Sequence, residues 1–180
     1  CGHFEGKAVV SVEEMVQRIQ AARDARNNDE GILIIARTDA RASLGLDAAI
    51  DRAKIYAEAG ADLLFVEAPH SEDELAQIGS ELSGHRLMAN MVEFGKTPLL
   101  SADRLAELGY CLIIHPGAIT RAVVELTRAV LGDLRTTGST KGWLDRMATF
   151  ADVNALLGLP EANEWEVEIS RRAAEVGDSE

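Results

Sequence analysis

Polar side chains follow each of four short apolar runs in the sequence, where a strand would end. They are Arg37 and Asp39 after the first run, Glu67 after the second, Asn90 and Glu93 after the third, and His115 after the fourth. The planar fork of an arginine suits a carboxylate, and an asparagine amide can donate to one. If the runs are parallel strands, these side chains meet at one edge of a sheet. The pattern therefore predicts a site for a carboxylate anion.

The apolar runs that must position these side chains begin at Ile32, Leu63, Leu87 and Leu112. Successive runs start about 24 to 31 residues apart, which leaves one helix in each gap and matches a βαβ unit of about 30 residues. Serines that suit helix N-caps precede three of the helices, at Ser11, Ser71 and Ser101. We therefore expect an α/β fold, the C-terminal half of a (β/α)₈ barrel.

Length and charge narrow the possible functions. The chain has 180 residues, whereas a complete barrel needs about 250, so we expect the first half of the barrel to lie outside it. The net charge of −12, with scattered basic residues, argues against nucleic acid and anionic membranes as partners. No apolar run is long enough to span a bilayer. Cys1 and Cys111 are far apart, which favours free thiols in the cytoplasm, with Cys111 buried in its strand.

The C-terminal part of the sequence is helical in pattern. A long amphipathic helix is expected from Ile119 to Leu134, and a second helix from Trp143 to Leu157, followed by a polar tail from Glu161. We expect residues 1–135 to form the half barrel and residues 136–180 a helical extension.

Cys1 and His3 form a further reactive pair, because a neighbouring imidazole can lower the pKa of a thiol. A chain beginning Cys-Gly also fits an N-terminal nucleophile hydrolase, whose α-amine would be the base. Such enzymes stack antiparallel sheets, whereas a helix follows every strand predicted here. The hydrolase is therefore the distant alternative.

Several motifs, in one order, resemble those of the isocitrate lyase and phosphoenolpyruvate mutase superfamily. They are CGH (1–3), ARTDA (36–40), AGADLLFVEA (59–68), ANMVEFGKTPLL (89–100) and LGYCLIIHPG (108–117). The Cys-Gly-His loop favours the carbon–carbon bond lyases of that superfamily over its phosphonate mutases. The resemblance implies that Cys1 and His3 are catalytic, the Cys1 thiol protonating a carbanion. It places Gly2, Arg37, Glu67, Asn90 and Arg121 against the substrate, and we expect Asp39, Glu93 and His115 to support them. From the residues alone, Asp39 could instead cap the next turn, and His115 could be a satisfied core histidine.

The resemblance also implies a cofactor and an assembly. Members of the superfamily use Mg²⁺, held mainly by carboxylates on strands that precede the Cys-Gly-His loop, so we expect no metal ligand in this chain and no turnover by it alone. The helix after the last strand is exchanged between subunits, which predicts a homotetramer built as a dimer of dimers.

Two positions depart from the methylisocitrate lyases of the superfamily. Phe150 stands where those enzymes carry another arginine, and Val92 where they usually carry a threonine. Both changes make the pocket more apolar. We therefore expect a 2-alkylmalate-type 2-hydroxy dicarboxylate as substrate, cleaved to a 2-oxo acid such as pyruvate plus a carboxylic acid. A methylisocitrate lyase, or an oxaloacetate decarboxylase or other enzyme of the mutase branch, is the alternative.

Overall fold

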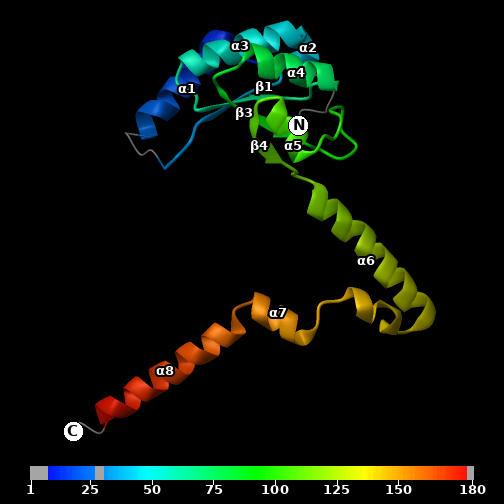
Figure 1. Ribbon diagram of the computed structural model, residues 1–180. Coiled ribbons are helices and arrows are strands. Elements are labelled where there is room, and N and C mark those ends of the chain that lie inside the picture. Colours follow the sequence, from blue (N-terminus) through cyan, green and yellow to red (C-terminus); the bar gives the residue numbers. More distant parts are fainter. Residues whose placement is uncertain (1–7, 27–30, 178–180) are drawn as a thin grey trace. The chain divides into compact units, whose positions relative to one another are not determined.

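Figure 1 shows the computed structural model of the chain, which describes residues 8–26 and 31–177. The chain forms two compact units, one up to residue 122 and one from residue 123 onward. The expected division after residue 135 stays a prediction.

The first unit is built on a parallel sheet of four strands that pair in chain order. The strands are β1 (Ile35–Thr38), β2 (Leu63–Val66), β3 (Arg86–Asn90) and β4 (Tyr110–Ile114). The helices are α1 (Val12–Arg26), α2 (Ala40–Leu44), α3 (Leu46–Glu58), α4 (Glu72–Glu81) and α5 (Ala102–Glu107). This architecture confirms the predicted α/β fold with a parallel sheet, and it excludes the stacked antiparallel sheets of the hydrolase alternative among the described residues.

The core lies on one face of the sheet, where α1, α3 and α4 pack (Figure 1). Alternate strand residues such as Ala36, Leu64 and Leu87 are buried there against Ile50 and Leu75 from the helices. Because strand side chains alternate between faces, the neighbouring positions project to the opposite face. Arg37, Phe65 and Asn90 are among them. The helices therefore cover one face of the sheet, and the candidate site lies on the opposite face.

The helix starts agree with the sequence. The hydroxyls of Ser11, Ser71 and Ser101 each accept a hydrogen bond from the backbone N–H three residues later, at 3.1, 3.1 and 3.2 Å. The expectation for Cys111 is wrong, because its side chain is exposed on β4. β4 has β3 as its neighbour and ends the described sheet, so a residue of this strand is open to solvent although its sequence is apolar.

The second unit is helical. It comprises α6 (Ala118–Thr137), which begins in the first unit, the 3₁₀ helix η1 (Lys141–Arg146), α7 (Phe150–Leu156) and α8 (Leu159–Gly177). The helix expected from Trp143 to Leu157 is interrupted, because Thr149 and Asp152 form a capping box that starts α7. The polar tail expected from Glu161 is instead the long helix α8. None of the helices in the described part of the chain is both long and apolar enough to cross a bilayer.

Candidate functional site

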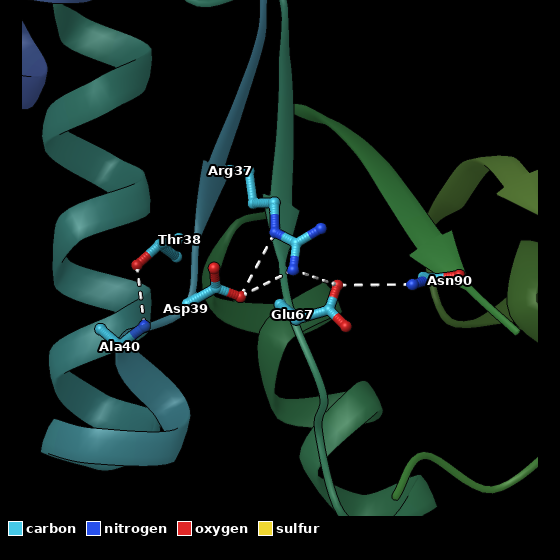
Figure 2. A network of polar contacts seen from close by, with 6 residues as sticks. All are labelled: Arg37, Thr38, Asp39, Ala40, Glu67 and Asn90. Atoms are coloured by element: carbon cyan, nitrogen blue, oxygen red, sulfur yellow. Dashed lines mark hydrogen bonds and ion pairs between the residues drawn. The ribbon is translucent and has the colours of Figure 1, made fainter. Parts of the chain in front are cut away.

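Arg37 is the centre of a polar network at the C-terminal end of β1 (Figure 2). Its guanidinium lies 5.0 Å from the centre of the Phe65 ring, a cation–π contact that supports it from the neighbouring strand. Its Nη2 donates to Asp39 Oδ1 at 2.9 Å, and its Nε lies 3.3 Å from the same oxygen. The same Nη2 is 3.4 Å from Glu67 Oε2. The Arg37 guanidinium thus lies between the carboxylates of Asp39 and Glu67.

Glu67 follows β2 and is almost completely buried, with 2% of its surface exposed. Its backbone N–H donates to the Thr38 carbonyl at 3.0 Å, which extends the pairing of β1 with β2 by one residue. Its Oε2 accepts a hydrogen bond from Asn90 Nδ2 at 3.4 Å. A buried carboxylate requires such partners, and here they come from the two neighbouring strands.

Asn90 ends β3 and presents its two amide atoms differently. Its Nδ2 donates to Glu67 Oε2 (Figure 2), which uses one of the two N–H groups of this amide. Its Oδ1 is buried and has no hydrogen-bond partner in the described structure. An acceptor of this kind can take a hydrogen bond from a bound molecule.

A second cluster lies where β3 and β4 end. Arg121, in the first turn of α6, donates from Nη1 to Glu93 Oε2 at 2.8 Å. His115 follows β4 and is exposed rather than a core histidine; its Nδ1 is 3.8 Å from Glu93 Oε1. Glu93 therefore lies between a guanidinium and an imidazole.

Residues of both clusters line one cavity of about 460 Å³ within the first unit. Its lining consists of Arg37, Glu67, Asn90, Val92, Glu93, Phe94, Gly95, Pro116, Gly117 and Arg121. The charged side chains of this lining are two arginines and two glutamates, so its formal charge is zero. The arrangement can bind an anion with two separated carboxylates, provided that further positive charge balances the dianion.

A further ion pair joins helix α2 to helix α4. Arg41 of α2 donates to both carboxylate oxygens of Glu74 on α4, from Nε at 2.9 Å and from Nη2 at 2.5 Å. The hydrogen bonds from Arg41 lower the pKa of Glu74 below its ordinary value. Burial, with the positive charge of Arg41, lowers the pKa of the neighbouring His70. This pair joins the segments that follow β1 and β2.

The described residues do not form a metal centre. No group of three or more histidine, cysteine, aspartate and glutamate side chains in the described ranges could hold a metal ion. Glu67, the buried carboxylate of the cavity, is engaged by Arg37 and Asn90. The described residues therefore do not fit a Mg²⁺ site by themselves.

The structure brings together most of the residues that the sequence singled out. Arg37, Asp39, Glu67 and Asn90 form the first cluster, and Glu93, His115 and Arg121 the second. Cys1, Gly2 and His3 lie outside the described residues. The catalytic and binding roles of all these side chains remain proposals. Sequence reasoning missed Gly117, against which Arg121 lies; its position between a strand end and a helix start was the available signal.

Comparison with known proteins gives concordant matches. The sequence pattern of the family described as phosphoenolpyruvate phosphomutase matches residues 2–135. The chain is 45% identical over 170 residues to a 2,3-dimethylmalate lyase of Eubacterium barkeri, covering 92% of this chain and 57% of the relative. It is 44% identical over 169 residues to a probable 2-methylisocitrate lyase of Corynebacterium glutamicum, covering 94% and 55%.

A solved structure agrees with these relatives. The crystal structure of a 2,3-dimethylmalate lyase, described as a member of the PEP mutase/isocitrate lyase superfamily, superimposes with a TM-score of 0.84 at 34% identity. The match covers 94% of this chain and 56% of that one. The chain thus spans a little over half the length of the proteins it matches.

Proposed function

Because the chain belongs to the phosphoenolpyruvate phosphomutase family, we propose that the protein containing it is a carbon–carbon bond lyase acting on a 2-alkylmalate-type 2-hydroxy dicarboxylate. The products would be a 2-oxo acid such as pyruvate and a carboxylic acid. Relatives named as 2,3-dimethylmalate lyase and 2-methylisocitrate lyase support this reaction class. The proposal concerns the complete protein, since this chain spans about half of those relatives.

The cavity with two arginines on separate elements is the observation that carries the proposal. Arg37 comes from β1 and Arg121 from the start of α6, and both line the same 460 Å³ cavity. Two guanidiniums in one cavity suit the two carboxylates of a malate-type substrate. We assign Arg37 to one carboxylate and Arg121 to the other, with Glu67 and Asn90 completing the wall beside Arg37.

In the proposed reaction a base of the complete protein takes the proton of the substrate's C2 hydroxyl, and the C2–C3 bond breaks. C2 becomes the carbonyl carbon of the 2-oxo acid, and the electron pair of the broken bond remains on C3 and spreads onto the adjacent carboxylate. The Cys1 thiol then gives its proton to C3, with His3 poising the thiol. The roles of Cys1, Gly2 and His3 rest on the sequence resemblance. Fixed donors at the carboxylate where the charge develops would lower the barrier.

We propose Mg²⁺ as cofactor, bound by carboxylates outside the described residues. The charges on the cavity lining cancel, so a bound dicarboxylate would leave two negative charges unbalanced. A divalent cation held by those carboxylates would supply that positive charge.

The lining of the cavity favours an alkyl-substituted substrate. Val92, Phe94 and Pro116 contribute apolar surface, which can contact alkyl groups on a malate backbone. Methylisocitrate carries a third carboxylate, whereas the described residues contribute two arginines, Arg37 and Arg121, to the lining. Phe150, at the start of α7, stays a predicted pocket residue.

We also propose that the complete protein is a homotetramer in which α6 is exchanged between subunits. Within the described chain α6 buries none of its residues. Three of its large apolar side chains, those of Val123, Leu126 and Leu131, are 45 to 58% exposed. A helix with such a face requires a partner surface.

The test is an assay of pyruvate release from 2,3-dimethylmalate by the full-length protein with Mg²⁺. Replacing Arg37 by lysine keeps its charge but removes the planar fork, so we expect kcat/KM to fall about 100-fold. The matched control is Arg104→Lys on α5, where the arginine pairs with Glu72 and Glu107 at the surface. The control should keep the parent rate.

Three outcomes would contradict the proposal. Unchanged activity of Arg37→Lys would remove this residue from the site. Faster cleavage of methylisocitrate than of dimethylmalate would favour the alternative substrate. Full lyase activity of Cys1→Ser would refute thiol protonation, and decarboxylation of oxaloacetate by that variant would favour the mutase branch.

A further inference from the structure

The side chain of Arg121 is confined by two neighbours that come from different loops. Its Nη1 donates to Glu93, which follows β3, at 2.8 Å. Its backbone N–H donates to the carbonyl of Gly117, which follows β4, at 2.9 Å. The side chain then lies back over the same glycine, in the direction that helical side chains take towards the N-terminus of their helix.

The fit of Arg121 on Gly117 leaves no room for a side chain at the glycine. A Cβ built on Gly117 would lie 2.0 Å from Arg121 Nη1 and 2.7 Å from its Cζ. Both contacts are to the far end of a flexible side chain. An alanine at this position would therefore displace the guanidinium while the backbone of the loop stays in place.

Glu93 provides the second restraint. Its side chain is 24% exposed and that of Arg121 44%, so the pair lies at the rim of the cavity. A long arginine side chain in that position loses considerable rotamer entropy when it is held in one place. The Glu93 carboxylate and Gly117 together hold the guanidinium in one position. An isolated ion pair at the surface would contribute little to holding it there.

We propose that Glu93 and Gly117 are positioning residues: together they form a seat that holds the Arg121 guanidinium in one position. The position of this guanidinium sets where the second carboxylate of a dicarboxylate ligand binds. The inference rests on the proposed function, because it assumes a ligand with two carboxylates. In this proposal Gly117 and Glu93 act on the carboxylate that binds Arg121 without having to contact the ligand themselves. His115, near the other oxygen of Glu93 at 3.8 Å, borders the same carboxylate.

The seat has a consequence for selectivity. A monocarboxylate that pairs with Arg37 does not use Arg121, so its affinity is independent of the seat. A dicarboxylate needs the two guanidiniums at a fixed separation. Disturbing Glu93 or Gly117 should therefore weaken dicarboxylates selectively.

The experiment is calorimetric titration of the full-length protein with 2-methylsuccinate, a dicarboxylate without the hydroxyl needed for cleavage, and with 2-oxobutyrate, a monocarboxylate. The variants are Glu93→Gln and Gly117→Ala. Their matched controls are Glu125→Gln, whose carboxylate pairs with Arg128 on the surface of α6, and Gly132→Ala, which would meet no atom within 4 Å.

We expect each seat variant to bind 2-methylsuccinate about tenfold more weakly, as for the loss of one charged hydrogen bond, with unchanged affinity for 2-oxobutyrate. In an Arg121→Ala background neither substitution should change the affinity further, because residues that act through Arg121 are coupled to it. Both controls should bind as the parent does.

The outcomes distinguish the positioning role of Glu93 and Gly117 from the proposed lyase function. Equal weakening of both ligands, or additive losses in the Arg121→Ala background, would overturn the positioning role and leave the lyase proposal intact. Failure of the parent protein to bind 2-methylsuccinate would overturn the dicarboxylate site and the seat together.

Discussion

Gly79, a buried glycine in α4, gives the sharpest prediction about stability. A Cβ on this residue would lie 1.9 Å from the carbonyl oxygen of Leu108 and 3.1 Å from its carbonyl carbon. Both of these obstacles are backbone atoms at the turn that leads into β4. Ordinary contact begins near 3.4 Å, so α4 would have to retreat from this turn by about 1.5 Å in a closely packed core.

The expected cost of Gly79→Ala follows from that displacement. Overpacking of a core costs typically about 1 to 3 kcal/mol, and more when backbone must move on both sides. The higher helix propensity of alanine offsets about 1 kcal/mol of this loss in the free energy of unfolding. We therefore expect a net loss of about 2 kcal/mol in the free energy of unfolding. Ser80→Ala is the control, because Ser80 is the exposed neighbour in the same helix; it should be neutral or slightly stabilising.

The measurement is urea unfolding of the full-length variants at pH 7, followed by far-ultraviolet circular dichroism. Gly79 contacts the turn that precedes β4, whereas the cavity lies beyond the C-terminal end of this strand. At a temperature where the variant is folded, kcat/KM should therefore match that of the parent. A Gly79→Ala protein as stable as Ser80→Ala would refute the close approach of α4 to Leu108.

Two further predictions concern buried hydrogen bonds and acid stability. The Tyr110 hydroxyl donates to the Leu75 carbonyl at 3.2 Å inside the core, so Tyr110→Phe should lower the free energy of unfolding by about 1 kcal/mol; an unchanged value in the same urea assay would show that the bond contributes nothing. Arg41 lowers the pKa of Glu74, so this carboxylate contributes stability above its unfolded pKa and loses it as the pH falls through the folded pKa. Glu74→Gln should therefore be less stable than the parent at pH 7, and the difference should shrink at pH 3; an equal difference at both values would contradict the pair.

The fold was largely predictable because its signals are local. Four apolar runs at regular spacing indicated the parallel strands, and three serines with hydroxyls at the N-cap marked helix starts. The prediction that Cys111 is buried was wrong because an apolar run does not reveal which strand ends the described sheet. The exposure of a strand residue depends on neighbours that the local sequence does not specify.

Helix α8 was missed for a different reason. Gly158 and Pro160 lie between the predicted helix, which ends at Leu157, and the predicted polar tail from Glu161. In the structure Gly158 ends one helix and Pro160 lies at the start of the next. Gly158 ends α7 with a φ of 75°, a conformation that glycine adopts without strain. Pro160 lies in the first turn of α8, where its missing N–H is tolerated. The same two residues therefore fit both interpretations.

For the candidate site, the sequence predicted which strand ends meet but not which atoms pair. Parallel topology brings Arg37, Glu67 and Asn90 to one edge, and this follows from their position after apolar runs. That the Asn90 amide donates to Glu67 depends on side-chain rotamers. The role of Gly117 depends on the path of Arg121 across it. Neither has a local signature.

The pairing of each strand with its neighbour in the chain also bears on how the site is assembled during synthesis. In the order β1-β2-β3-β4, no described strand has to wait for a distant segment of the chain before it can pair. As the chain leaves the ribosome from its N-terminus, the Arg37 cluster can form once β3 has emerged. The pair of Glu93 with Arg121 forms only after β4 and the first turn of α6 have followed. The cluster around Arg37 and the cluster around Arg121, which we propose to bind the two carboxylates, would thus form one after the other.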